Sequence, residues 1–204
     1  MYKGNNGFIL KFGDLAKTLS LEDWKTTSLE DLDSDTEWVA IVTDDAEAYL
    51  NEINAIVTKM KHPKTCFVID LHPCANYKHL QKLWDNYMMV DRESVEVLLS
   101  FIHHHLVNHS MISFTIQDFR VCSVPYPFVK AVSADIVKDA PIDPNAQAVC
   151  YGLSFEQACE LGTSYLNAFA KTTDKIDEDK YVPWSIQYSS DNVIEAIFFY
   201  ERKF

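Results

Sequence analysis

The sequence predicts an α/β (or α+β) protein in which residues ~36–120 form a mainly parallel sheet with flanking helices, followed by a helix and a C-terminal antiparallel hairpin. Two observations lead to this prediction. The runs WVAIVT (38–43) and TCFVIDL (65–71) are almost continuously apolar and of strand length, as expected for parallel strands buried on both faces. The segment between them, 44–61, has apolar residues at helical spacing, and strand–helix–strand alternation is typical of a parallel sheet.

The elements of the first half follow from apolar periodicity and capping signals. Strands are predicted at 8–12, 38–43, 65–71 and 111–119, and helices at 44–61, 77–89 and 92–109. Asp44, three residues before Glu47, predicts a capping box at the start of the first of these helices. Asp91 is the expected N-cap of the last one.

The second half has fewer regular signals. A strand is predicted at 148–153, then a helix at 154–171 that starts with a Ser154/Gln157 capping box, then two strands joined at SSDN as the C-terminal hairpin. Both alternating sets of side chains in 193–200 are apolar, so this strand is either central or covered on its outer face. The cover is either the preceding helix or a protein partner, which makes four aromatic residues candidates for partner binding: Trp184, Tyr188, Phe198 and Tyr200.

Composition bounds the class of protein. The 204 residues are 48% hydrophobic, enough for a sizeable core, and predict one globular domain over 1–204, with sub-lobes 1–122 and 123–204 left open. The net charge of −12 leaves no basic stripe for phosphates, so direct nucleic-acid binding is not expected. No apolar run approaches the roughly 18 residues of a membrane span. Scattered cysteines without a C-x-x-C motif, and no secretory signal, predict a reduced, cytoplasmic protein.

Histidines are concentrated in the stretch FIHHHLVNHS (101–110). On an α-helix, His105 and His109 share one flank, so they are the pair that could bind a metal ion together. The alternative is that both cap carbonyls at the end of the helix, where the helix dipole raises their pKa. We favour capping, because Leu106 follows His105 where a zinc protease has glutamate.

Acidic side chains follow the predicted parallel strands. Asp44 and Asp45 come directly after the first long apolar strand, and Asp70 and His72 lie at the end of the next one. The carboxyl ends of parallel strands meet at one edge of a sheet, where open α/β sheets bind ligands. These four residues therefore predict an acidic crevice that could hold Mg²⁺ or Zn²⁺.

The sequence contains no motif for phosphate binding or nucleophilic catalysis. It has five glycines and lacks the G-x-x-x-x-G-K, G-x-G-x-x-G and G-x-S-x-G patterns, so no catalytic residue is assigned and no cofactor is expected. The first functional hypothesis is a non-catalytic acidic protein-binding module: an inhibitor, immunity factor, adaptor or assembly subunit, with a protein partner whose surface could be basic. The alternative is a metal-dependent hydrolase or transferase that uses Mg²⁺ or Zn²⁺ in the acidic crevice.

Overall fold

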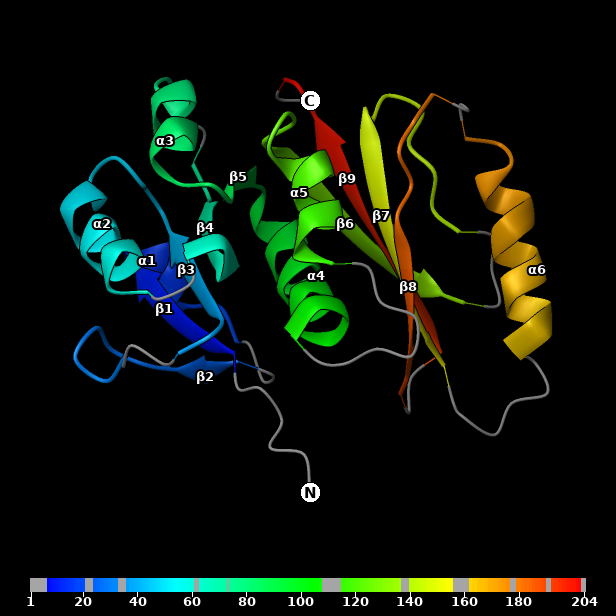
Figure 1. Cartoon of the computed structure of the whole chain (residues 1–204), viewed down its shortest axis with the longest axis horizontal. Coiled ribbons are helices and arrows are strands. Elements are labelled where there is room, and N and C mark those ends of the chain that lie inside the picture. The colour runs from blue at the N-terminus through cyan, green and yellow to red at the C-terminus, as the bar shows by residue number, and fades with distance from the viewer. Residues whose placement is uncertain are drawn as a thin grey trace.

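The computed structural model of the protein describes residues 7–20, 24–32, 36–60, 63–72, 74–107, 115–136, 140–155, 162–176, 179–189 and 192–202. Within these residues one sheet has nine strands in the order β2-β1-β3-β4-β5-β6-β9-β7-β8, and helices lie on both of its faces (Figure 1). The strands are β1 (Phe8–Phe12), β2 (Lys25–Thr26), β3 (Val39–Thr43), β4 (Cys66–Asp70), β5 (Tyr87–Val90), β6 (Phe128–Asp135), β7 (Ala148–Phe155), β8 (Trp184–Tyr188) and β9 (Val193–Tyr200). The helical elements are α1 (Asp14–Lys17), α2 (Leu50–Lys59), η1 (Pro63–Thr65), α3 (Tyr77–Leu83), α4 (Arg92–Ile102), the π-helical turn η2 (His103–Val107), α5 (Ile116–Ser123) and α6 (Gly162–Thr173).

The sheet is parallel apart from one strand. Strand β9 is antiparallel to both of its neighbours, β6 and β7. All other pairings among the described strands are parallel. The carboxyl ends of every strand except β9 therefore lie at the same edge of the sheet, which we call the carboxyl-end edge. The opposite edge is the amino-end edge.

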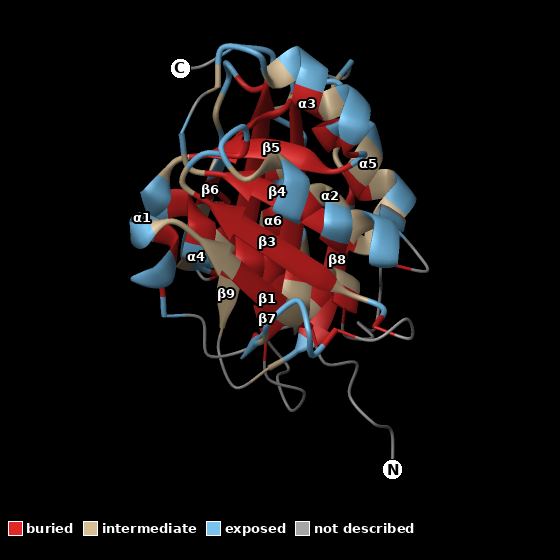
Figure 2. Cartoon of the chain, turned by 90° about the vertical axis from the view of Figure 1, so that its left-hand side faces the viewer, coloured by how far each residue is buried: buried red, intermediate tan, exposed pale blue. Residues whose placement is uncertain are grey.

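Two apolar clusters, one on each face of the sheet, form the core. One cluster contains buried side chains of α2, α3 and α6, and the other contains buried side chains of α1, α4 and α5. Strand β3 contributes to both, because Val39 and Ile41 face the first cluster and Ala40 and Val42 face the second. Its continuous apolar sequence is thus explained by burial on both faces. Figure 2 shows the buried strands in the middle of the molecule and the exposed residues on the outer sides of the helices.

The predicted fold class is confirmed: the chain is α/β, its first half has a parallel sheet with flanking helices, and its C-terminal strand is antiparallel. The antiparallel partners differ from the predicted ones, because the two strands joined at SSDN, β8 and β9, do not pair with each other. Strand β9 pairs with β6 and β7, whereas β8, which precedes it in the sequence, pairs with the other side of β7. The doubly apolar strand is therefore central, which was one of the two alternatives.

The segment 77–89 was predicted as one helix, and this was wrong. Helix α3 ends at Leu83, and the chain then forms β5 from Tyr87. All four residues of β5 are buried between β4 and β6. Tertiary burial on both faces has overridden a sequence with helical spacing.

The strand predicted at 111–119 was also wrong where the structure describes it. Residues 115–119 belong to the start of α5, and residues 111–114 lie outside the described part of the chain. Thr115 and Asp118 form a capping box, since the Thr115 side chain accepts from the backbone N–H of Asp118 and the Asp118 side chain accepts from that of Thr115. This threonine-x-x-aspartate signal favours a helix start.

Ser154 was predicted to cap a helix, but it lies within β7, and α6 starts later, at Gly162. The hydroxyl of Ser154 instead accepts a hydrogen bond from the side-chain amide of Gln187 in β8, at 3.0 Å. Among the helices that the structure describes, none has the length and apolar character needed to cross a bilayer.

Candidate functional site

The carboxyl-end edge brings together the acidic residues that the sequence singled out. Asp44 and Asp45 follow β3, Asp70 ends β4, and Asp91 follows β5. This is the edge at which an open parallel sheet binds ligands. The hydrogen-bond partners of each carboxylate decide whether it is available for a ligand.

Asp44 caps the short helix α1, which follows the neighbouring strand β1. One carboxylate oxygen accepts from the backbone N–H of Leu15 at 2.8 Å, and the other from that of Ala16 at 2.7 Å. Gly13 makes this approach possible. Its φ is +91°, a conformation that favours glycine, and a Cβ at this position would lie 2.4 Å from the Asp44 carboxylate.

Two other aspartates at this edge also accept hydrogen bonds from backbone N–H groups at the start of a helix or turn. Asp45 accepts from the backbone N–H groups of Glu47 and Ala48, each at 3.0 Å, in the turn before α2. Asp91 accepts from the backbone N–H of Ser94 at 2.8 Å, which confirms it as the N-cap of α4. The predicted Asp44/Glu47 capping box is wrong, because Asp44 reaches across to α1 instead.

Asp70 is fully buried, and its carboxylate is held by three donors. The hydroxyl of Tyr87 donates to it at 2.8 Å, the backbone N–H of His72 donates at 3.1 Å, and the backbone N–H of Ala46 also donates. Burial raises the pKa of Asp70 to about 6, although these hydrogen bonds act in the opposite direction. The raised pKa of Asp70 is therefore caused mainly by its burial in the core.

The structure gives the predicted metal ligands other partners. In the described part of the chain, no group of three or more histidine, cysteine, aspartate or glutamate side chains could hold a metal ion. Asp44 and Asp45 are used as caps, and Asp70 faces Tyr87 inside the core. The predicted Mg²⁺ or Zn²⁺ crevice has no supporting geometry among these residues.

Replacing Asp44 by alanine is expected to lower the free energy of unfolding by about 0.5–2 kcal/mol, the usual loss for an N-cap carboxylate. Two backbone N–H groups of α1 would lose their acceptor. Urea denaturation of the wild type and the variant measures the difference. Asp14→Ala is the matched control, since Asp14 is an exposed carboxylate in the same turn. Equal stability of Asp44→Ala and Asp14→Ala would contradict the assigned role.

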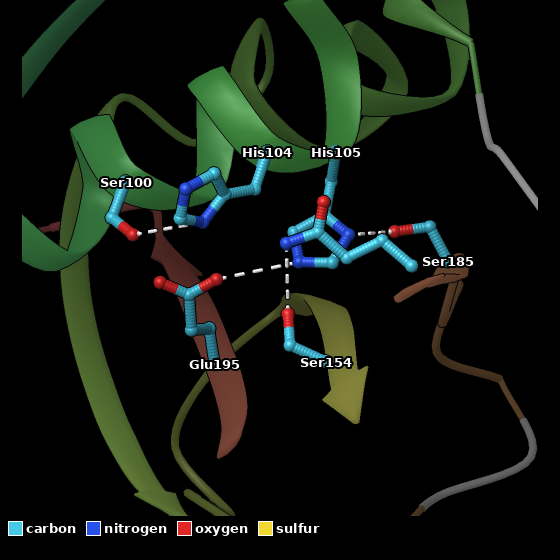
Figure 3. Close-up of polar contacts among 7 residues, drawn as sticks. Ser100, His104, His105, Ser154, Ser185 and Glu195 are labelled. Atoms are coloured by element: carbon cyan, nitrogen blue, oxygen red, sulfur yellow. Dashed lines mark hydrogen bonds and ion pairs between the residues drawn. The ribbon is translucent and has the colours of Figure 1, made fainter. Parts of the chain in front are cut away.

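A second polar cluster is centred on His105 and lies between η2 and the strands β7, β8 and β9. The side chain is 1% exposed. Its Nδ1 lies 2.6 Å from the hydroxyl of Ser185 in β8, and its Nε2 lies 3.3 Å from a carboxylate oxygen of Glu195 in β9 (Figure 3). Glu195 and Ser185 are the register partners of Gly152 on either side of β7, so the imidazole ring lies over this glycine.

The sequence-based interpretation of His105 was wrong. It predicted an accessible helix end and a raised pKa, whereas burial lowers the pKa of His105 despite the opposing effect of Glu195. The contacts fit a neutral ring that accepts from the Ser185 hydroxyl and presents Nε2–H to Glu195. His109, the other member of the predicted pair, lies outside the described residues.

The residues Ser185, His105 and Glu195 combine a hydroxyl, an imidazole and a carboxylate, but they are sealed from solvent. Ser185 is 0% exposed and Glu195 is 4% exposed. No substrate can reach the hydroxyl in this arrangement, so the geometry supports a structural polar cluster. Sequence reasoning had no signal that connects these residues, because they lie on different elements and meet through the register of β9, β7 and β8.

The four aromatic residues predicted to bind a partner fall into two pairs. Trp184 and Tyr188 on β8 are 38% and 45% exposed. Phe198 and Tyr200 on β9 are 3% and 5% exposed, because β9 lies in the middle of the sheet. Of these four residues, only the β8 pair is accessible to another molecule.

Comparison with known proteins identifies the fold. No protein-family model matches the chain, and no curated protein matches it either. Among solved structures, CetZ from Methanosaeta thermophila strain DSM 6194 matches with a TM-score of 0.51 and 12% identity, covering 83% of this chain and 63% of that chain. A mutant of FtsZ from M. jannaschii matches with a TM-score of 0.48 and 10% identity, covering 81% of this chain and 66% of that chain. GDP-form protofilaments of Bacillus thuringiensis serovar israelensis TubZ match with a TM-score of 0.38 and 12% identity, covering 79% of this chain and 53% of that chain.

The chain thus shares the fold of CetZ and spans less than two thirds of that chain, 63% of its length. Two predictions from the sequence are corrected by these comparisons. The first is the non-catalytic acidic protein-binding module (inhibitor, immunity factor, adaptor or assembly subunit), with the metal-dependent enzyme as its alternative, since the solved structure whose fold the chain shares is CetZ. The second is the expectation of no cofactor, or of Mg²⁺ or Zn²⁺, which these comparisons do not support; TubZ, for its part, was solved in a GDP form and a GTPγS form.

A nucleotide phosphate needs free backbone N–H groups at a helix N-terminus, or nearby cations. At the carboxyl-end edge, two backbone N–H groups of α1 are bonded to Asp44, two of the turn before α2 to Asp45, and one of α4 to Asp91. These residues do not fit a phosphate as they are arranged, and we derive no chemical step through a nucleotide at this edge.

Proposed function

We propose that the chain is a self-assembling subunit that stacks head to tail, with the carboxyl-end edge of one copy against the amino-end edge of the next. The observation behind the proposal is that exposed carboxylates lie at the carboxyl-end edge and exposed lysines at the amino-end edge, in the β1–β5 part of the sheet. The protein partner expected from the sequence is then a second copy, and the basic surface expected of that partner is the amino-end edge.

The carboxyl-end edge is acidic. Exposed carboxylates lie at the starts of α1 and α4 and in the turn before α2: Asp14, Asp45, Glu47 and Glu93. Basic side chains near these carboxylates are Lys17, which ends α1, and Arg92, which donates to the hydroxyl of Thr18 at 2.9 Å. A like-charged surface of this kind repels itself, so two acidic edges do not associate.

The amino-end edge carries lysines. Lys25 begins β2 beside the start of β1, and Lys59 ends α2. Both lysines are exposed, and exposed acidic residues lie near them in the segment before β3, at Glu30, Asp31 and Glu37; the Nζ of Lys59 donates to the carbonyl of Leu29 in this segment. Contact between edges of opposite charge is heterologous, and repetition of such a contact gives an open chain of subunits. Because exposed ion pairs are individually weak and screened by salt, the association should be sensitive to ionic strength.

Sedimentation velocity at low and high salt tests the proposal. We expect the wild type to form species that grow with protein concentration at low salt and dissociate at high salt. Asp14→Lys with Glu93→Lys, and Lys25→Glu with Lys59→Glu, should each abolish growth. A mixture of the two double variants should grow again, because the two intact edges are opposite in charge and so are the two charge-reversed edges.

The control variants are Lys171→Glu and Asp174→Lys, which reverse exposed charges at the end of α6, outside the β1–β5 part of the sheet. They should assemble like the wild type. A wild type that stays monomeric at low salt would refute the proposal, and so would growth of either double variant on its own. A further experiment adds GDP with Mg²⁺. Growth that requires the nucleotide would show that the contact depends on the nucleotide and does not form by charge alone.

A further inference from the structure

Strand β8 is the last strand of the sheet, and one of its sides carries no strand. In the part of the chain that the structure describes, its only strand neighbour is β7, with which it pairs in parallel from Trp184 to Tyr188. Its sequence, WSIQY, has no charged residue, in a chain of net charge −12. Edge strands of monomeric proteins are usually protected by charges, bulges or shortness, because unpaired backbone groups are a template for another strand.

The backbone of β8 presents its free hydrogen-bonding groups at alternate residues. Pro183 accepts from the backbone N–H of Tyr151 at 3.0 Å, and the backbone N–H of Ser189 donates to Phe155 at 3.1 Å. Since backbone direction alternates along a strand, odd-numbered residues face β7 throughout. The N–H and C=O groups of the even-numbered residues, Trp184, Ile186 and Tyr188, point to the free side.

The side chains of β8 are arranged symmetrically about its middle residue. Ile186 has a small or polar residue on each side, Ser185 and Gln187, and an aromatic residue beyond each of these, Trp184 and Tyr188. The two aromatic side chains are the exposed ones, while Ile186 is 1% exposed. Read in the opposite direction, the strand has the same pattern of residue classes.

We propose that β8 pairs antiparallel with β8 of a second copy, centred on Ile186, to form a closed two-fold dimer. In this register Ile186 faces its own copy, and Trp184 of each chain lies opposite Tyr188 of the other. All three of these pairs use residues whose backbone groups point outward, so each exchanges two hydrogen bonds, about six in all. Trp–Tyr cross-strand pairs are among the favourable ones. The symmetry of the strand is what selects a second copy, since a two-fold interface requires a self-complementary surface.

This dimer is independent of head-to-tail stacking. It uses the free side of β8, whereas head-to-tail stacking uses the carboxyl-end edge and the amino-end edge. It closes at two copies, whereas the head-to-tail contact repeats. It also involves no charged side chain of β8, so high salt should not dissociate it. The experiment below uses the Asp14→Lys/Glu93→Lys background, in which contact between the sheet ends is blocked.

The test is a charge swap across the proposed pair, measured by sedimentation equilibrium at low salt, where charge pairs are least screened. In Trp184→Lys/Tyr188→Lys, lysine faces lysine twice in the dimer, and the dimer should weaken by about tenfold or more. In Trp184→Lys/Tyr188→Glu, lysine faces glutamate twice, and the dimer should persist within a few-fold of the parent. Both variants lose the same ring contacts, to Phe169 and Phe155, so they are matched for stability, which thermal unfolding checks.

Three results would overturn the proposal. A parent protein that is monomeric at every accessible concentration would show that β8 does not pair. A dimer that survives the lysine–lysine variant would place the interface elsewhere. Equal loss of the dimer in both variants would indicate a general apolar contact in place of the register centred on Ile186.

Discussion

Replacing Gly152 by alanine is expected to lower the free energy of unfolding by about 1–3 kcal/mol, as for other insertions into a packed core. A Cβ at this position would lie 2.3 Å from Nε2 of His105. The ring cannot simply move aside, because Ser185 holds one of its nitrogens and Glu195 faces the other. Urea denaturation of the wild type and Gly152→Ala at neutral pH measures the loss.

A double-mutant cycle with His105→Ala tests whether the imidazole causes the loss. His105→Ala alone should destabilise the protein, because it leaves a cavity and a buried Glu195 without its partner. In the combined variant the methyl group added by Gly152→Ala has room. The combined variant should therefore lose less stability than the sum of the two single losses, by about 1 kcal/mol or more. Additive costs would show that Gly152 is required for another reason.

Replacing Asp70 by asparagine is expected to stabilise the protein above pH 6 and to leave it unchanged near pH 4. The folded pKa of Asp70 is about 6, above the value of about 3.9 for an unfolded chain, so between these values the folded state binds the proton more tightly. The free energy of unfolding therefore falls as the pH rises through this window. By pH 7 the loss from this one group is about 3 kcal/mol, and the Asp70→Asn variant does not incur it.

The measurement is the difference between wild type and Asp70→Asn in urea denaturation at several pH values from 4 to 8, which cancels the titration of other groups. Tyr87→Phe is a second variant, and it should raise the pKa of Asp70. It removes a hydrogen bond that lowers the pKa of Asp70, so the pH window should move upward. Parallel stability curves for wild type and Asp70→Asn would contradict the burial-shifted pKa.

Elements whose burial follows from local sequence were predicted correctly. Strands β3 and β4 are apolar on both faces because both faces are covered, and Asp91 caps α4 through a contact three residues away. Strand β5 was missed because its burial depends on β4 and β6, which lie before and after it in the chain. Its four residues carry no periodicity of their own that separates a strand from the end of a helix.

The candidate site was predicted less well, for two physical reasons. The histidines were assigned to helical positions at about 100° per residue, and His105 was placed on a flank of the helix beside Leu98. This flank is buried, because Leu98 and Phe101 are both 0% exposed and the Phe101 ring contacts His105, so His105 points into the core. Its partners Gly152, Ser185 and Glu195 are adjacent only through strand register, which residue spacing in the sequence does not specify.

The central position of β9 has a consequence for synthesis of the chain. Strands β1 to β6 join the growing sheet beside strands already made, and β7 and β8 can pair with each other before the chain is finished. Strand β9, which is made after all the others, supplies the contact between β6 and β7. A nascent chain that ends before residue 193 therefore holds two separate pieces of sheet, each with an open edge. Pairing of the eight residues of β9 with β6 and β7 joins these two pieces into one sheet.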